Sequence, residues 1–477
     1  MRKIHIILIT ITSAILLCFV ILIALQQYAG QDTVPKGTTV AGMNVGGIKK
    51  EDALQILADQ FAEMESSTVV FEAPNLQVNL TWREIGVNYD AGKFRAALST
   101  LSEGNLWNRI SARKNFPEVW KMNTSYDPKP LLAVFSPDWE KSRFGELVNA
   151  VRTIANDDSI HYLPGQPAQR IHWELFSSAI KSASPTSLSE GNNKSMEATV
   201  IKIPLQLVQP PVTIDTLKQE GIKRKIAQFS TGLQNSGTGR VYNVEAAAQT
   251  IDGMTLPPGG IFDYASVIES AEEVYGFREA PVIFGGKLVP GVGGGICQVS
   301  STLYNAAIRA GLTIVERRNH SLPVSYVPKG QDATFAKGYI NFRFKNTSGQ
   351  HLLIRAQVEN GVLTVKLFGD MPQNVTYEIQ SRTSKVLPST NKYVVNKTLP
   401  AGAWEIIIQG KEGYIVETYQ IKKIDGKVVE TRKLSKDTYP SQPTVIAMHD
   451  EGSDKGIISP DTNPKRIVED GVEGPTF

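Results

Sequence analysis

Residues 293–312 read Gly-Gly-Gly-Ile-Cys-Gln-Val-Ser-Ser-Thr-Leu-Tyr-Asn-Ala-Ala-Ile-Arg-Ala-Gly-Leu, the most informative stretch of this 477-residue chain. Val299, Leu303 and Ala310 recur at helical spacing, and Gly311 suits the position just after a helix. The stretch therefore predicts a helix that begins near Cys297, directly after three glycines.

Two properties of this position favour chemistry at the Cys297 thiol. The helix macrodipole and the free N–H groups of a first turn lower the pKa of a cysteine placed there. Glycines let a substrate approach the main chain and leave amide hydrogens for an oxyanion. His320 and Asp332 follow in the chain after a predicted strand over residues 313–317. This order is that of cysteine peptidases and transglutaminase-like enzymes, so Cys297, His320 and Asp332 are candidate catalytic residues.

Each of these residues also has a structural interpretation. Cys297 suits a small buried position between a helix and a strand, His320 could pair with Glu316, and Asp332 could cap a turn. His320 lies only 23 residues after Cys297, which leaves room for little beyond one helix and two strands. Cys297, His320 and His351 show no regular ligand spacing, so neither a metal nor another cofactor is expected.

The N-terminal segment has the features of a membrane anchor. Residues 6–25 carry no formal charge and consist mainly of Ile, Leu, Val and Phe. About 20 apolar residues match the ~30 Å hydrocarbon core of a bilayer. Arg2 and Lys3 precede this run and predict a cytoplasmic N-terminus. A cleaved signal peptide is the alternative, but the run exceeds the usual apolar region of about 7–15 residues. Either way, the rest of the chain is exported.

Composition excludes one class of partner and one class of crosslink. Fifty basic and 47 acidic side chains give a net charge of +3, too balanced to suggest nucleic-acid binding. Cys18 lies in the apolar run, so Cys297 is the single cysteine of the exported part. The exported domains therefore depend on ordinary hydrophobic cores and not on an intramolecular disulfide.

We predict an α+β multidomain protein in five segments. Residues 1–30 are the cytoplasmic N-terminus and the anchor, and residues 31–225 form a first α+β domain. Residues 226–370 form a second α+β domain, here called the central domain. Residues 371–449 form an extended all-β module, here called the C-terminal module, and residues 450–477 form a disordered acidic tail.

Local patterns predict several elements inside these domains. The apolar positions predict helices over residues 49–64 and 240–251, and strands over residues 68–72, 76–82 and 199–208. Alternation of apolar residues from Gly338 to Leu367 predicts a meander of three strands. In the C-terminal module the predicted strands span residues 394–400, 405–409, 414–423 and 428–434.

The central domain resembles the VanW family. The resemblance rests on residues 293–306, on Glu316-Arg-Arg-Asn-His-Ser and on Asp332-Ala, with Phe229-Ser-Thr, Arg240-x-x-Asn243 and Leu256-Pro-Pro-Gly-Gly-Ile-Phe-Asp upstream. It covers about residues 229–369. Members of the family are associated with glycopeptide-resistance clusters of Gram-positive bacteria, and the domain has no settled activity. Ala336-Lys-Gly-Tyr-Ile-Asn stands where relatives often carry a second acidic residue.

The flanking domains also resemble known ones. Residues 38–212 resemble the peptidoglycan-binding-like unit of YoaR-like proteins, on Gly42-x-x-Val45-x-Gly47, Trp82-x-x-Ile85-Gly and Pro211-Val-Thr. The C-terminal module resembles a G5 domain, on Gly410-x-x-Gly413 and Asp425-Gly-Lys-Val-Val-Glu-Thr-Arg. The G5 resemblance implies binding of N-acetylglucosamine-containing glycans. Trp404 and Tyr414 are the candidate sugar-stacking side chains, and packing between strands is the alternative role for each.

Two classes of function follow from the sequence. In the first, the protein is an extracytoplasmic, single-pass membrane protein that binds peptidoglycan or another cell-wall glycan and has no catalytic role. In the second, it is a cysteine-dependent peptidoglycan amide hydrolase or transpeptidase-like enzyme that uses Cys297, His320 and Asp332. At this site we expect ligand contacts from Gly294, Gly295, Gln298, Ser300 and Arg318.

Overall fold

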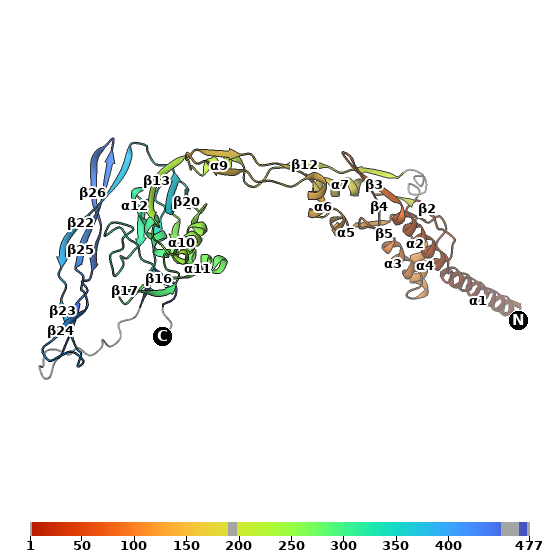
Figure 1. Ribbon diagram of the computed structural model, residues 1–477. Coiled ribbons are helices and arrows are strands. Elements are labelled where there is room, and N and C mark those ends of the chain that lie inside the picture. Colours follow the sequence, from red (N-terminus) through yellow and green to blue (C-terminus); the bar gives the residue numbers. More distant parts are fainter. Residues whose placement is uncertain (1, 189–197, 450–466, 475–477) are drawn as a thin grey trace. The chain divides into compact units, whose positions relative to one another are not determined.

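The computed structural model describes residues 2–188, 198–449 and 467–474 and has mixed helix and sheet (Figure 1). The chain divides into two compact units. The first unit comprises residues 1–149 and 165–211, and the second comprises residues 150–164 and 212–477.

Helix α1 (Arg2–Ala29) is a candidate membrane span by length and composition. At 1.5 Å per residue its 28 residues extend for about 42 Å, which exceeds the ~30 Å core of a bilayer. All side chains from residue 2 to residue 24 are exposed, as expected for a helix whose partner is lipid. An N-terminal signal sequence can have the same length and apolar composition.

Helix α2 (Lys50–Ser66) organises the core of the first unit. It buries Ala53, Leu57 and Phe61 on one face, close to the predicted helix over residues 49–64. Strands β3 (Thr68–Ala73) and β4 (Leu76–Thr81) also lie near their predicted positions, in a sheet of order β11-β3-β4. The other elements of this unit are β1 (Thr39–Val40), β2 (Met43–Asn44), β5 (Val87–Asp90), α3 (Gly92–Thr100), α4 (Leu106–Lys114), β6 (Val119–Trp120), β7 (Asn123–Tyr126), α5 (Lys129–Val134), α6 (Pro137–Phe144), β10 (Ala168–Ile171) and α7 (Trp173–Ala183).

The single strand predicted over residues 199–208 is two strands. Strand β11 (Thr199–Lys202) pairs in parallel with β3, whereas β12 (Leu205–Val208) pairs antiparallel with β10. Pro204 stands between them and lacks the N–H that a continuous ladder would need.

Helix α12 (Ile296–Arg309) is the centre of the second unit. Every residue from Ile296 to Ile308 is buried, so this helix is covered on all sides. It contacts β13 (Arg224–Gly232) and β21 (Val362–Gly369) of a four-stranded sheet, β13-β21-β20-β14. Helix α10 (Thr238–Ile251), predicted over residues 240–251, contacts both α12 and β20 (Leu352–Glu359).

The predicted three-stranded meander is wrong in its first strand. Strands β20 and β21 form a hairpin around Asn360 and Gly361, both with positive φ. However, β19 (Arg343–Lys345) pairs with β15 (Ile261–Asp263) and β18 (Thr313–Glu316) in a separate sheet. Alternation of apolar residues fixes which face a strand buries but not which strand it pairs with. The remaining elements of the second unit before the C-terminal module are β8 (Val151–Ile154), β9 (Ile160–Leu163), α9 (Ile214–Gln219), β14 (Thr255–Leu256), α11 (Tyr264–Tyr275), β16 (Glu279–Phe284) and β17 (Lys287–Val292).

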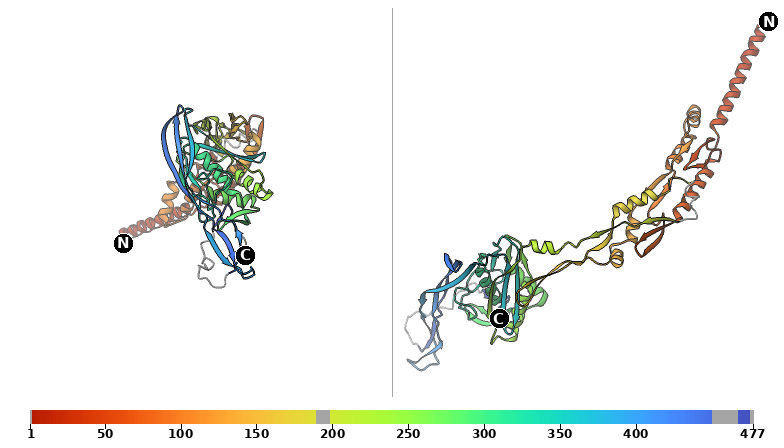
Figure 2. Two further views of the ribbon diagram at one scale, coloured as in Figure 1. Left: turned by 60° about the vertical axis from the view of Figure 1, so that its left-hand side comes forward. Right: turned by 90° about the horizontal axis from the view of Figure 1, so that it is seen from above.

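The C-terminal module consists of two three-stranded sheets. Long strands β22 (Val375–Leu387), β25 (Gly413–Ile424) and β26 (Lys427–Tyr439) form the first sheet and lie beside the central domain, where β22 contacts α12 (Figure 2). The second sheet has the order β23-β27-β24. Its strands are β23 (Asn391–Val395), β24 (Trp404–Ile408) and β27 (Thr444–Met448).

Part of the predicted disordered tail is a packed segment of the second unit. Residues 450–466 and 475–477 lie outside the described residues, but residues 467–474 are placed on the central domain. Strand β28 (Val468–Glu469) pairs antiparallel with β16. Asp470, Gly471 and Val472 are buried, so the acidic composition of the tail was misleading for this segment.

Candidate functional site

The three glycines before α12 form a turn that other residues would strain. Gly293 and Gly295 have φ values of +89° and +111°, in the left-handed half of conformational space. A Cβ at Gly294 would lie 2.4 Å from the carbonyl oxygen of Pro281. The glycines therefore bring the chain from β17 to the start of α12 through a tightly packed turn.

This turn directs two amides at one carboxylate. The N–H groups of Gly295 and Cys297 donate to Oδ1 of Asp470, at N···O distances of 3.2 and 2.8 Å. Oδ2 of Asp470 accepts from Nη1 of Arg240 at 3.0 Å. The sequence predicted that amide hydrogens here could bind an anion. It gave no indication that the carboxylate of an aspartate 173 residues away would accept hydrogen bonds from them.

The Cys297 thiol is fully buried beside this carboxylate. Its Sγ accepts from the Phe335 N–H at 3.0 Å and lies 3.4 Å from the Phe335 carbonyl oxygen. Burial, and next the negative charge of Asp470, raise the pKa of Cys297 well above its usual value. The net shift of the Cys297 pKa is therefore opposite to the lowering expected from the helix N-terminus.

His320 and Asp332 form a buried pair. Nδ1 of His320 lies 2.7 Å from Oδ2 of Asp332, and the same oxygen accepts from the main-chain N–H of His320 at 2.7 Å. Oδ1 of Asp332 accepts from the Tyr439 hydroxyl at 2.5 Å and from Nη2 of Arg317 at 3.3 Å. The C-terminal module thus supplies one of the donors to this acid.

The pKa values of the pair move apart. Burial raises the pKa of Asp332, but the hydrogen bonds and charge of His320 and the charge of Arg317 outweigh it and hold the pKa at about 2. Burial lowers the pKa of His320, and Asp332 outweighs it, so the net shift is upward. The structure therefore favours a charged carboxylate that orients the imidazole ring.

The cysteine and the histidine are not hydrogen-bonded to each other. Within residues 198–449 and 467–474, no hydrogen bond joins Sγ of Cys297 to His320. Nε2 of His320 is buried without a hydrogen-bond partner in the described structure. The site thus contains an oriented histidine and a helix-terminal cysteine, but no assembled triad.

The other residues predicted at this site fall into two groups. Gly294, Gln298 and Ser300 are buried in the supporting network: the Gly294 carbonyl accepts from Asn243, Gln298 bonds to Thr231, Gly232 and Arg240, and Ser300 donates to the Ala333 carbonyl. Arg318 differs, because its side chain is exposed and its carbonyl oxygen accepts from the Thr334 N–H. These positions support the site and do not line an open cleft.

The two aromatic candidates of the C-terminal module differ in exposure. Trp404 is 66% exposed. Tyr414 is half-buried, and Nζ of Lys329 lies 3.7 Å from the centre of its ring. Tyr414 therefore packs against the central domain, whereas Trp404 leaves its ring available to a ligand.

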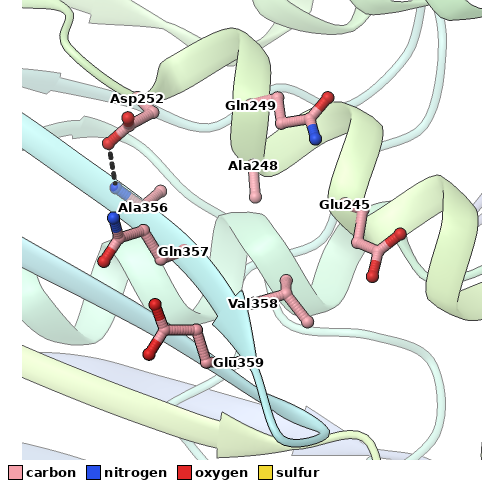
Figure 3. Close-up of a pocket in the computed structure, with 8 residues that line it drawn as sticks. All are labelled: Glu245, Ala248, Gln249, Asp252, Ala356, Gln357, Val358 and Glu359. Carbon is pink, nitrogen blue, oxygen red and sulfur yellow. Dashed lines mark hydrogen bonds between the residues drawn. The ribbon is translucent and has the colours of Figure 1, made fainter.

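A polar hollow of about 420 Å³ lies between α10 and β20 (Figure 3). Glu245 and Gln249 extend from α10, and Gln357 and Glu359 from β20. Oδ1 of Asp252 at its edge accepts from the Ala356 N–H at 2.8 Å. No residue of the Cys297 site lines this hollow. Among the described residues, no group of three His, Cys, Asp or Glu side chains is placed to hold a metal ion.

Comparison with known proteins identifies two domains. Residues 239–368 match the family described as VanW like protein, and residues 378–448 match the G5 domain. The chain is 39% identical over 168 residues to the uncharacterized protein YoaR of Bacillus subtilis, which covers 35% of this chain and 55% of that protein. It is 25% identical over 177 residues to the vancomycin B-type resistance protein VanW of Enterococcus faecalis, which covers 34% and 64%. The chain thus spans less than two thirds of either relative.

Two solved structures resemble the C-terminal module. The IgA1 protease G5 domain is 18% identical, with a TM-score of 0.14, and the match covers 16% of this chain and 92% of that one. HP0197-G5 is 27% identical, with a TM-score of 0.12, and the match covers 16% and 96%. The family matches confirm two of the predicted resemblances: the central domain is a VanW-like domain, the C-terminal module is a G5 domain, and the chain is consistent with the family of VanW and YoaR.

Proposed function

We propose that this protein is a membrane-anchored extracytoplasmic cell-wall protein that binds N-acetylglucosamine-containing glycans of peptidoglycan through its G5 domain. Helix α1 is the anchor, and the wall-binding surface is one face of the sheet β23-β27-β24. The observation that carries the proposal is an exposed apolar face on this sheet.

Strand pairing places six apolar side chains on that face in two rows. Residues paired across neighbouring strands point to the same side of a sheet. One row is Tyr393, Ile446 and Ile406, and the other is Val395, Met448 and Trp404. Four of the six are exposed, and Trp404 is the most exposed. Exposed apolar patches mark interaction sites, and an indole ring suits the C–H face of a sugar.

Trp404→Ala is expected to weaken binding of the full-length protein to purified cell walls about tenfold. That factor corresponds to ~1.4 kcal/mol, the order of one lost stacking contact. Binding is measured by sedimentation with cell walls and by titration with N-acetylglucosamine oligomers. Tyr339→Ala is the matched control, because Tyr339 is an aromatic residue that is 65% exposed and lies in the VanW-like domain, not on this sheet. Equal binding by Trp404→Ala and wild type would exclude this face, and no sedimentation of the wild type would exclude wall binding.

A second candidate function is a cysteine-dependent amide hydrolase or transpeptidase-like activity on peptidoglycan stem peptides. One observation favours it: the amides of Gly295 and Cys297 converge on an oxygen beside the thiol, as oxyanion donors do. In this candidate Cys297 is the nucleophile, His320 is the base, and Asp332 orients the histidine. The full burial of Cys297 favours the binding function over this one, because the thiol is not accessible to a substrate.

Cys297→Ser is expected to complement a deletion of the gene as well as the wild type does. A serine hydroxyl can keep both contacts with the Phe335 main chain, so the packing survives while a thiol nucleophile is lost. The measurement is growth with a cell-wall antibiotic, with thermal unfolding of the purified variant as the folding control. A folded variant without complementation would favour the enzyme, and Cys297→Ala should then fail in the same way.

A further inference from the structure

Strand β20 has an outer edge that is only partly paired. On that side its neighbour is β14, which pairs with no more than the first two residues of β20. Two hydrogen bonds continue along the edge: the Ile354 N–H donates to the Met254 carbonyl at 2.9 Å, and the Ala356 N–H donates to Oδ1 of Asp252 at 2.8 Å. Beyond Ala356, no strand or bridge of the described chain pairs with this edge.

The alternation of the strand fixes which main-chain groups this edge presents. In an antiparallel pair, every second residue directs its N–H and its carbonyl away from the partner strand. Ile354 and Ala356 direct their N–H groups away from β21, so Val358 does the same. The open edge therefore offers the N–H and the carbonyl of Val358 and the carbonyl of Ala356. Such a row of groups is a template for pairing with another extended chain.

The polar hollow between α10 and β20 lies directly beside this open edge (Figure 3). The hydrogen bond between Asp252 and Ala356 closes one end of it, and Glu245 and Glu359 lie farther along α10 and β20. Its volume of about 420 Å³ is in the range of ligand sites in proteins. The hollow therefore provides room where an added strand would lie, about 4.8 Å from β20.

Two carboxylates that line the hollow have no cation beside them. In the part of the chain that the structure describes, neither Glu245 nor Glu359 forms an ion pair or a side-chain hydrogen bond. The third carboxylate, that of Asp252, is already paired with Nε of Arg355 at 2.7 Å. The whole chain has a net charge of +3, so it does not attract cations in general. The hollow is thus a local acidic site that favours a basic occupant.

The two carboxylates lie on opposite faces of the sheet. Val358 packs against the core cluster that contains Ala247 and Ala248 of α10, so α10 and its Glu245 lie on the core side of β20. Glu359 is the next residue after Val358, and its exposed side chain points to the other face. Consecutive residues of an added strand would also point to these two faces in turn. Two consecutive basic side chains would therefore each meet one carboxylate.

We propose that the open edge of β20 and the hollow beside it, together called the β20 groove, bind an extended segment of a partner protein with two consecutive basic residues. The segment adds one strand to the sheet. Main-chain hydrogen bonds with Val358 hold it, and its basic side chains pair with Glu245 and Glu359. The β20 groove shares no residue with the Cys297 site or with the proposed glycan surface, so this binding does not depend on the proposed wall function.

The probe is a fluorescent, capped peptide, Thr-Val-Lys-Lys-Val-Thr, and fluorescence anisotropy measures its binding to the full-length protein in a neutral detergent at low ionic strength. Glu245→Gln/Glu359→Gln is expected to weaken binding at least tenfold, because both ion pairs are lost while the shape of the groove is kept. Glu269→Gln/Glu273→Gln is the matched control. It removes the same charge from exposed positions on α11 and should bind the peptide as the wild type does.

A second peptide tests the added strand separately from charge attraction. N-methylation of both lysine amides keeps the two charges but removes the N–H that would donate to the Val358 carbonyl. This peptide is expected to bind at least tenfold more weakly than the first. Saturating amounts of the first peptide should also slow hydrogen exchange at the Val358 N–H at least tenfold. The Ala356 N–H should change less, because it already donates to Asp252.

Three results would overturn the proposal. The first is the absence of peptide binding by the wild type, and the second is equal binding by the wild type and Glu245→Gln/Glu359→Gln. The third is equal binding of the N-methylated peptide with unchanged exchange at Val358, because the peptide would then be held by charge alone. In each case the two carboxylates would serve to keep other chains off an exposed strand edge. Trp404→Ala should bind the peptide as the wild type does, so failure of the glycan surface and failure of the β20 groove are distinguishable.

Discussion

Arg317→Met is expected to lower the free energy of unfolding of the VanW-like domain by about 3–5 kcal/mol. The Arg317 side chain is 5% exposed and lies between two buried acids, Asp332 at 3.3 Å and Asp437 at 2.6 Å. Its Nε also donates to the Asp332 carbonyl at 2.6 Å. Methionine fills a similar volume but leaves both carboxylates in a low-dielectric environment without their cation, and the cost of those buried charges dominates. Urea or thermal unfolding followed by circular dichroism measures the loss.

The neighbouring arginine provides the matched control. Arg318 has the same charge one position along the chain, but its side chain is exposed, so Arg318→Met should change stability by less than about 0.5 kcal/mol. The loss of unfolding free energy for Arg317→Lys should lie between those of the other two variants, because one ammonium group cannot replace a guanidinium that makes hydrogen bonds in three directions. A loss below about 1 kcal/mol for Arg317→Met would contradict the proposed role of the buried cluster.

The sequence identified the members of the candidate site that are close in the chain. Cys297 at a helix start, and His320 followed by Asp332, were recognised because residue type and order carry this information. Arg317, Asp437 and Tyr439 were not, because their role arises where the G5 domain packs on the VanW-like domain. Asp470 was missed for a related reason: its segment is short, acidic and poor in large apolar residues, which predicts disorder until its partner surface is known.

The predicted direction of the Cys297 pKa shift was wrong because tertiary contacts, which the sequence does not show, determine the net shift. A helix N-terminus is a local feature, and its effect on a thiolate is the one contribution that the sequence could indicate. Burial and the charge of Asp470 are tertiary features, and they act in the opposite direction with the larger total. A sequence therefore gives one contribution to such a pKa and not the sum.

Elements with strong local periodicity were predicted well, and their partners were not. Helices α2 and α10 lie within two residues of their predicted bounds. Strand β22 was missed, because its second half, after Ile379, is mostly polar and exposed. It is nevertheless a long strand, held by its ladder with β25 and by contact with α12, which no pattern within the strand reveals.

The double variant Asp437→Ala/Tyr439→Phe, in the G5 domain, is expected to destabilise α12 in the other domain. Asp437 and Tyr439 face the VanW-like domain from β26, at 2.6 Å from Arg317 and 2.5 Å from Asp332. Losing both leaves Arg317 and Asp332 buried with fewer partners. We expect a cost of about 4–6 kcal/mol, less than the sum of two independent losses because the groups share one network.

Hydrogen exchange of the α12 amides measures this effect, and about a thousandfold faster exchange corresponds to ~4 kcal/mol. Lys436→Gln/Thr438→Ser is the control, because both residues are exposed on the same strand and alternate with the buried pair. Unchanged exchange at α12 in the Asp437/Tyr439 variant would mean that the two domains fold independently. If exchange accelerates as expected, deleting residues 374–449 would remove the glycan surface and would also unfold the Cys297 site. Wall binding by the G5 domain is then tested cleanly only by a surface change such as Trp404→Ala, which leaves this interface intact.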